Sequence, residues 1–99
     1  MSMSYDQVVS VLEEFSELKR KESTQNRATY YFPNSPIRRQ TVLQELYLTG
    51  NGYLYVGYLS EFQNRMDKNR LINIKTLSQD EFRSTLKKVL HSFQKTSKG

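Results

Sequence analysis

The chain has 99 residues, with 15 lysines and arginines against 10 aspartates and glutamates, so its formal net charge at pH 7 is +5. This length holds one hydrophobic core and predicts a single domain, and the basic balance favours nucleic acid or acidic protein surfaces as partners. The sequence contains no cysteine, which excludes disulfides, thiolate nucleophiles and cysteine-based zinc sites. It has no apolar run near the roughly 20 residues of a membrane span and no signal-peptide pattern at MSMSYDQ, so we expect a cytoplasmic protein without membrane contact.

Residues 4–21 have the apolar spacing of an amphipathic helix. The apolar positions recur at intervals of three and four, at Val8, Val11, Leu12, Phe15 and Leu18. Ser4 can cap the amino end, with Gln7 reaching back to close a capping box and Met3 packing against Val8. The run Lys19-Arg20-Lys21 would then place cations at the negative end of the helix dipole, which explains the run without a ligand.

A polar connector separates this helix from the first predicted strand. Residues 27–32 are rich in side chains that suit a pleated surface, and Pro33 ends the strand. Asn34-Ser35-Pro36 then predicts a turn, because proline fixes its own φ and disfavours helix in the residue before it.

The stretch 41–59 predicts a β-hairpin about Gly50-Asn51-Gly52, since glycine supplies the positive φ that tight turns need. With those residues as the loop, the expected pairs are Thr49–Tyr53, Leu48–Leu54, Tyr47–Tyr55, Leu46–Val56 and Leu43–Leu59. Residues 37–48 have a second interpretation as a helix, which Ser35-Pro36 could begin and Gly50 could end. The strand is preferred, because a helix would leave residues 53–59 without a hairpin partner.

The rest of the chain predicts a polar loop at 60–70, a short strand at 70–76 and a helix over 79–94. Ser78 and Glu81 have the spacing of a capping box, and Leu77 and Phe82 can pack around it.

These elements predict a two-layer α+β domain. A four-stranded antiparallel meander over residues 27–60 and 70–76 would carry both helices, 4–21 and 79–94, on one face. The buried face would consist of Ala28, Tyr30, Phe32, Val42, Leu46, Leu48, Leu54, Val56, Ile72 and Ile74.

Candidates for catalysis are few. The single histidine, His91, falls on the polar side of the last helix. Neither Glu13-Glu14 nor Asp80-Glu81 resembles a pair of carboxylates held for acid–base chemistry, and Gly50-Asn51-Gly52 lacks the Gly-Lys-Ser/Thr ending of a phosphate loop. We therefore expect no enzymatic activity, no metal and no cofactor.

The odd-numbered face of the sheet is the predicted binding surface. Its candidate residues are Tyr31, Arg39, Leu43, Tyr47, Tyr53, Tyr55 and Lys75. The first hypothesis is that this face binds another protein or a second copy of the chain, because tyrosine and arginine are enriched at interfaces. That hypothesis requires Leu43, Leu59 and Leu71 to join the tyrosines in one apolar patch.

The alternative hypothesis is that the same face binds single-stranded nucleic acid. Bases would stack on the tyrosine rings, and Arg27, Arg39 and Lys75 would be the nearest neighbours of those rings and hold phosphates. A third interpretation assigns no function to the tyrosines and treats them as good strand formers at half-exposed positions.

Overall fold

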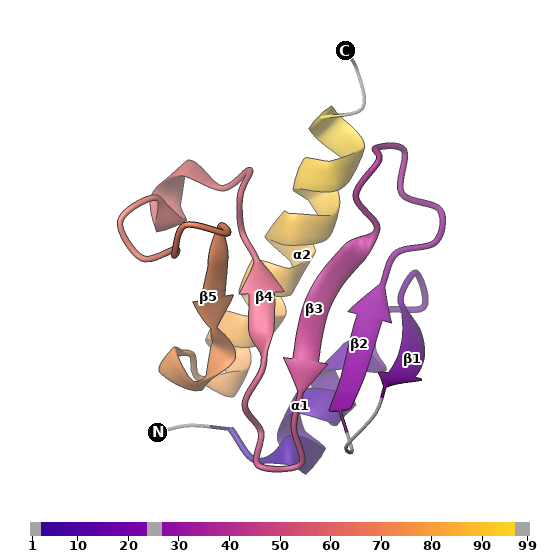
Figure 1. The fold of residues 1–99 in the computed structure, drawn as a ribbon, viewed down its shortest axis with the longest axis vertical. Coiled ribbons are helices and arrows are strands. Elements are labelled where there is room, and N and C mark those ends of the chain that lie inside the picture. The colour runs from indigo at the N-terminus through magenta and orange to yellow at the C-terminus, as the bar shows by residue number, and fades with distance from the viewer. Residues whose placement is uncertain (1–2, 24–26, 97–99) are drawn as a thin grey trace.

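The structure, a computed structural model, describes residues 3–23 and 27–96. In chain order its elements are α1 (Tyr5–Leu12), β1 (Lys19–Ser23), β2 (Arg27–Tyr31), β3 (Thr41–Leu46), β4 (Tyr53–Tyr55), η1 (Ser60–Phe62), β5 (Leu71–Asn73), η2 (Ile74–Thr76) and α2 (Gln79–Thr96) (Figure 1). The five strands form one antiparallel sheet in the order β1-β2-β3-β4-β5. The predicted α+β class is confirmed, with five strands instead of four.

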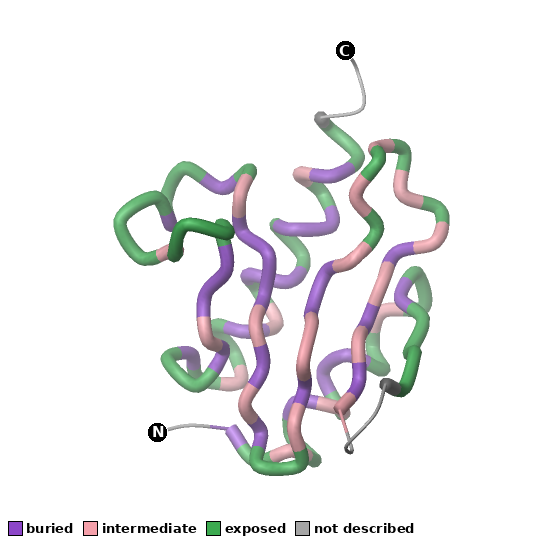
Figure 2. Tube along the Cα trace, viewed as in Figure 1, coloured by how far each residue is buried: buried purple, intermediate pink, exposed green. Residues whose placement is uncertain are grey.

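Both helices cover the same face of the sheet, behind the strands in Figure 1. Figure 2 shows buried positions alternating along the strands and recurring on α2. The apolar face was predicted correctly except for Leu48, which is 59% exposed. From α2, Phe82, Leu86 and Phe93 are fully buried and seal the core.

The predicted helix over 4–21 is too long. Helix α1 ends at Leu12, and Lys19–Ser23 form β1, which pairs with β2 along its whole length. Two turns connect them, in which the Phe15 and Leu18 amides donate to the carbonyls of Leu12 and Phe15. Leu18 is still buried, so these turns bury the apolar residues whose spacing suggested a longer helix. The free edge of β2 gives each residue of the basic run a cross-strand partner.

Arg20 fixes β1 against the first helix. Its Nη1 donates to the Tyr30 hydroxyl at 3.0 Å and its Nη2 to the Tyr5 hydroxyl at 2.7 Å. The bond to Tyr5, more than the one to Tyr30, raises the pKa of Arg20 above its usual value despite the opposing effect of burial. The Arg20 guanidinium therefore lies on the sheet face that the helices cover, where it joins β1 to β2 and α1.

Strands β3 and β4 form the expected hairpin in a different register. The strand interpretation is confirmed for Thr41–Leu46, but Leu43 pairs with Leu54, and the predicted pairs, Tyr47–Tyr55 and Leu43–Leu59 among them, are wrong. The Gly50 amide donates to the Tyr47 carbonyl at 2.9 Å and the Tyr47 amide to the Asn51 carbonyl at 2.8 Å. Gly50 has a φ of 92°, which is the left-handed position that ends a three-residue hairpin loop. It is the last residue of the loop, where the prediction made it the first.

Irregular pairing between β2 and β3 breaks the predicted alternation of faces. The aligned pairs shift along the strands, from Ala28–Leu46 through Tyr30–Leu43 to Tyr31–Thr41. Such a bulge places extra residues opposite one partner and re-aims the side chains around it. The adjacent residues Val42 and Leu43 are consequently both fully buried, and the prediction that Leu43 lies on the binding face is wrong.

The two predicted capping boxes are confirmed. The Gln7 amide donates to Ser4 Oγ at 3.2 Å while the Ser4 amide donates to Gln7 Oε1 at 2.9 Å. Ser78 and Glu81 make the equivalent bonds at 3.2 and 2.8 Å at the start of α2. The strand predicted over 70–76 is shorter than expected, because the side chain of Asn73 accepts a hydrogen bond from a following amide and begins the 3₁₀ turn η2.

Candidate functional site

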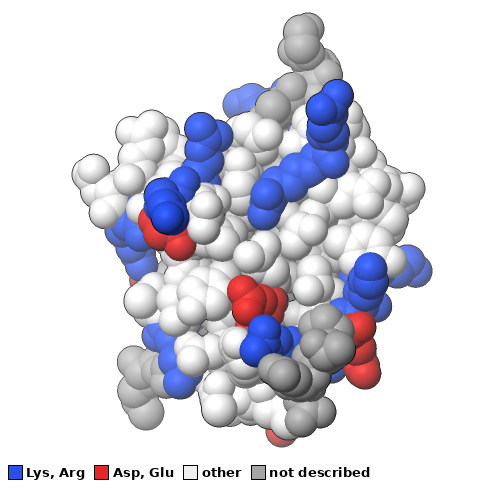
Figure 3. Space-filling view, viewed as in Figure 1, with Lys and Arg blue, Asp and Glu red and all other residues white. Residues whose placement is uncertain are grey.

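The sheet face that neither α1 nor α2 covers carries half-buried side chains, and we call it the open face. On β2, Arg27, Thr29 and Tyr31 are half-buried, whereas Ala28 and Tyr30 between them are buried. Because successive side chains of a strand point to opposite faces, Arg27, Thr29 and Tyr31 lie on the open face. Figure 3 looks onto this face and shows basic side chains spread over it among mostly uncharged ones, with a few acidic side chains, one of them near the middle.

Strand β1 adds two lysines to the open face. Lys19 pairs with Tyr31 and Lys21 with Thr29, and directly opposed residues of an antiparallel pair share a face. Tyr31 also pairs with Thr41 of β3. Lys19, Tyr31 and Thr41 therefore form a line across three strands, which we call the cross-strand row. Neighbouring strands lie about 4.8 Å apart, so the row spans about 10 Å.

A shallow groove of about 730 Å³ adjoins the cross-strand row. It is lined by Arg20, Lys21, Thr29, Tyr31, Gln40 and Thr41. Apart from Arg20, whose guanidinium is bonded to Tyr5 and Tyr30, these side chains offer ammonium, hydroxyl and amide groups beside one aromatic ring. None of the described residues that line the groove is a carboxylate. The groove therefore suits an anionic ligand that also presents a flat apolar group.

Arg39 and Tyr55 occupy the β4 end of the row. Arg39 Nε donates to the Thr41 carbonyl at 3.1 Å, and the guanidinium carbon lies 3.7 Å from the centre of the Tyr55 ring. Strands β3 and β4 diverge beyond their paired region (Figure 1), and the Tyr55 ring meets Phe93 of α2 edge-on, with 6.0 Å between ring centres. Tyr55 thus fills the space between the two strands, and it is only 7% exposed.

A second hollow lies on the β4–β5 side of the open face. Its lining residues are Gln44, Glu45, Tyr47, Tyr53, Asp67, Asn69 and Leu71. The Arg27 guanidinium lies 4.9 Å from the centre of the Tyr47 ring and forms an ion pair with Glu45 at 3.3 Å. Asp67 accepts hydrogen bonds from the backbone amides of Asn69 and of Leu71, the first residue of β5. The two carboxylates make this hollow a poorer anion site than the groove beside the cross-strand row.

Four of the predicted binding residues lie half-buried on the open face or at its border, but they do not form one cluster. Tyr31 lines the groove, Tyr47 and Tyr53 line the second hollow, and Arg39 lies over Tyr55. Of the three cations that the nucleic-acid hypothesis expected beside the rings, Arg27 and Arg39 each stack on a tyrosine ring, whereas Lys75 is exposed on η2.

The remaining predicted residues lie elsewhere. Leu43 is in the core and Tyr55 is buried beneath Arg39, while Lys75 is exposed on η2 beyond the end of β5. Leu43, Leu59 and Leu71 are 0%, 9% and 8% exposed. The apolar patch that the protein-interface hypothesis required is therefore missing from the part of the chain that the structure describes.

Sequence reasoning missed Lys19, Lys21 and Tyr58 as surface candidates. The two lysines belong to a charged run that is typical of an edge strand, a signal that the helical spacing of the preceding residues obscured. Tyr58 is 41% exposed and follows β4, where strand alternation no longer predicts the direction of a side chain.

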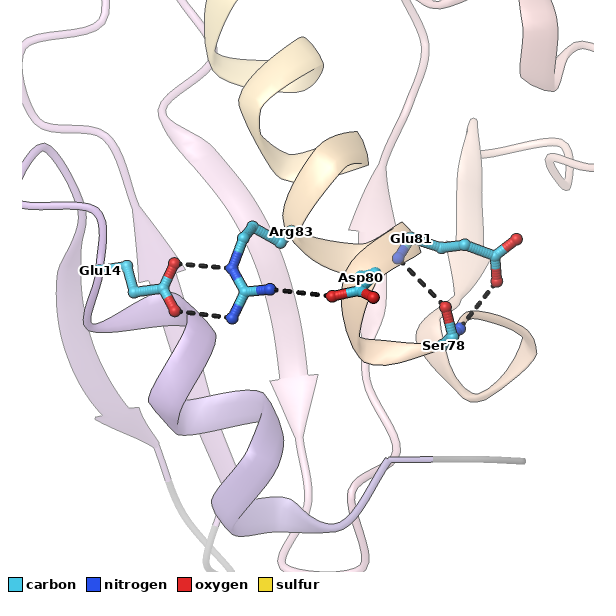
Figure 4. A network of polar contacts seen from close by, with 5 residues as sticks. All are labelled: Glu14, Ser78, Asp80, Glu81 and Arg83. Atoms are coloured by element: carbon cyan, nitrogen blue, oxygen red, sulfur yellow. Dashed lines mark hydrogen bonds and ion pairs between the residues drawn. The ribbon is translucent and has the colours of Figure 1, made fainter.

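Three of the acidic residues considered for catalysis, Glu14, Asp80 and Glu81, have structural partners (Figure 4). Arg83 donates from Nε and Nη2 to the two carboxylate oxygens of Glu14, both at 2.8 Å, and from Nη1 to Asp80 at 3.2 Å. The hydrogen bond from Arg83 is the largest influence on Glu14 and lowers its pKa. These contacts join α2 to the turn after α1, and Glu81 belongs to the helix cap.

Other kinds of site find little support. His91 is exposed on α2, as predicted. Within residues 3–23 and 27–96 there is no group of three or more histidine, aspartate or glutamate side chains placed to hold a metal ion. None of the helices in these ranges combines the length and the apolar character needed to cross a bilayer.

The chain matches no protein-family model, no curated protein and no solved structure.

Proposed function

We propose that the chain binds single-stranded nucleic acid along the cross-strand row of the open face. The observation that carries this proposal is the row itself, in which Lys19, Tyr31 and Thr41 follow one another across three strands and Arg39 bonds to the last of them. Lysine and arginine would neutralise backbone phosphates, while bases would stack on an aromatic ring. The adjoining groove, with its ammonium, hydroxyl and amide groups, favours the same ligand.

A single strand fits this surface better than a duplex. The open face is a sheet with tyrosine rings at half-buried positions, and only unpaired bases can turn their flat faces onto such rings. A duplex would leave the rings unused and would touch the row through its phosphates alone. The formal charge of +5 would add attraction that does not depend on sequence.

The direct test is fluorescence anisotropy with a labelled oligothymidylate about 12 nucleotides long and with a duplex of the same length. We expect the single strand to bind more tightly. We also expect its affinity to fall steeply between about 50 and 200 mM salt, with a slope of about −0.7 for each phosphate contacted. If the protein does not bind the oligothymidylate at the lower salt concentration, the proposal is wrong.

Matched lysine variants test the location. Lys21→Gln removes a charge that lines the groove, and Lys87→Gln removes the same charge from the exposed side of α2. Lys21→Gln should weaken binding and reduce the salt slope by about 0.7, and Lys87→Gln should change neither. Equal losses in the two variants would contradict binding on the open face. Light scattering at two protein concentrations tests the hypothesis that the open face binds a second copy of the chain. A dimer that Tyr31→Ser disrupts would support self-association in place of nucleic-acid binding.

A further inference from the structure

Arg39 has an unusual environment among the arginines of the chain. Arg20, Arg27 and Arg83 each form an ion pair with a glutamate, and Arg38, Arg65 and Arg70 are exposed to solvent. Arg39 is half-buried, yet it takes part in none of the ion pairs within the described residues. Burial lowers the pKa of Arg39, an effect that Tyr55 and Tyr58 oppose, and an arginine remains cationic at neutral pH. A bound anion would supply the charge partner that this cation lacks.

Two contacts hold the Arg39 guanidinium in one orientation. The bond from Nε to the Thr41 carbonyl fixes one edge of the group, and the stack on Tyr55 fixes its plane. Neither Nη1 nor Nη2 has a hydrogen-bond partner among the described residues. These two nitrogens form an edge that can donate to both oxygens of a phosphate. Because the group is already oriented, little further ordering opposes binding.

Tyr58 provides an exposed aromatic ring next to Tyr55. Its ring meets Tyr55 and Phe93 edge-on, with 5.7 and 5.9 Å between ring centres. These contacts restrict the side chain, and it nevertheless remains 41% exposed. Tyr55 therefore contacts Arg39 through the face of its ring and also contacts Tyr58, so a cation and an exposed ring both lie against Tyr55.

We infer that Arg39 and Tyr58 form a nucleotide subsite, in which Arg39 binds one phosphodiester group through Nη1 and Nη2 and Tyr58 stacks on the neighbouring base. The inference rests on the proposed binding of single-stranded nucleic acid and assigns one end of its path. The strand would cross β1, β2 and β3 on the cross-strand row and reach this subsite beside β4. Recognition there would depend on the planar geometry of arginine, beyond its charge.

Arginine and lysine variants separate geometry from charge in the oligothymidylate assay. Arg39→Lys should bind about tenfold more weakly than the wild type with an unchanged salt slope, because lysine keeps the charge and loses the two-point contact. Arg39→Gln should lose more affinity and reduce the slope by about 0.7. Arg38→Gln is the control, since Arg38 is the exposed neighbour, and its affinity should change by less than threefold (about 0.65 kcal/mol). Wild-type affinity in Arg39→Lys would refute the two-point contact.

Tyrosine variants and an uncharged backbone complete the test. Tyr58→Ser should weaken binding about 5- to 150-fold, whereas Tyr58→Phe should bind like the wild type, because it keeps the ring. With a methylphosphonate oligonucleotide, whose backbone has no charge, wild type and Arg39→Gln should bind equally. Thermal melting should first show that each variant is folded. If the wild type binds while Arg39→Gln and Tyr58→Ser bind equally well, the subsite is refuted and the proposed function stands. If the wild type does not bind, the proposed function fails and the subsite with it.

Discussion

Replacing Tyr55 and Tyr47 separately by alanine should give very different losses of stability. The two residues undergo the same chemical change in the same hairpin. Tyr55 is 7% exposed, lies under Arg39 and contacts the rings of Tyr58 and Phe93. Tyr47 is half-buried beside the loop, where Arg27 stacks on it. The comparison therefore isolates the effect of burial.

The magnitudes follow from these surroundings. Truncating a buried aromatic residue to alanine costs about 3–5 kcal/mol, a range that includes the loss of the edge-to-face contacts of Tyr55. Tyr47→Ala loses a stack at a partly exposed site, worth about 0.5–1 kcal/mol. For a domain of this size, each kilocalorie lowers the melting temperature by about 4–8 °C. Tyr55→Ala should therefore melt at least about 12 °C lower than the wild type.

Calorimetry and urea denaturation give the two free energies of unfolding. Losses that agree within about 0.5 kcal/mol would show that Tyr55 does not fill the space between β3 and β4, and the support assigned to Arg39 would fail with it. A loss in Tyr47→Ala that exceeds the loss in Tyr55→Ala would contradict the observed hairpin register.

Two further predictions concern the packing of the chain against itself. Stability should fall as the pH drops below 4.5, the ordinary pKa of glutamate, because Arg83 lowers the pKa of Glu14 in the folded state. The stabilisation from this ion pair is present above pH 4.5 and is lost as the pH falls through the folded-state pKa. Glu14→Gln should reduce this acid-induced loss in urea titrations at several pH values, and an unchanged pH profile would refute the role of the ion pair. Gly50→Ala should cost more than about 2 kcal/mol, since a φ of 92° disfavours a side chain and its Cβ would lie 2.6 Å from the Met3 carbonyl oxygen. Gly52→Ala is the control, because its Cβ would meet side-chain methyl groups at 3.4 Å or more, and equal losses would contradict the loop geometry.

The sequence predicted the fold well where local chemistry and tertiary packing agree. The capping boxes at Ser4 and Ser78 and the apolar stripe of α2 marked real elements, because each of these signals lies within one helix. The buried face of the sheet was also predicted with one exception, Leu48. Alternation along a strand is a strong signal where one face packs against helices.

The sequence failed where distant parts of the chain decide the outcome. Lys19–Ser23 become a strand because β2 offers an edge, and no local pattern shows that edge. The loop of the hairpin could be placed on either glycine, and Gly50 is selected by its close approach to Met3 at the start of the chain. The prediction of the candidate site was incomplete for the same reason. Tyr31 and Arg39 were identified from their residue types and their odd-numbered positions, whereas Tyr58 and the two lysines of β1 depend on pairings that the sequence does not reveal.

The irregular pairing of β3 determines both the core and the open face. With Leu43 opposite Tyr30 and Leu54, its side chain joins the core, and the half-buried Gln44 follows it in the strand. A strict alternation would have turned Leu43 outward, because a shift of one residue moves every side chain of a strand to the other face. The open face would then have gained leucine and lost polar surface. The same bulge that completes the core thus keeps the cross-strand row polar and basic, and for this reason a variant that regularises β3 should lose stability and nucleic-acid binding together.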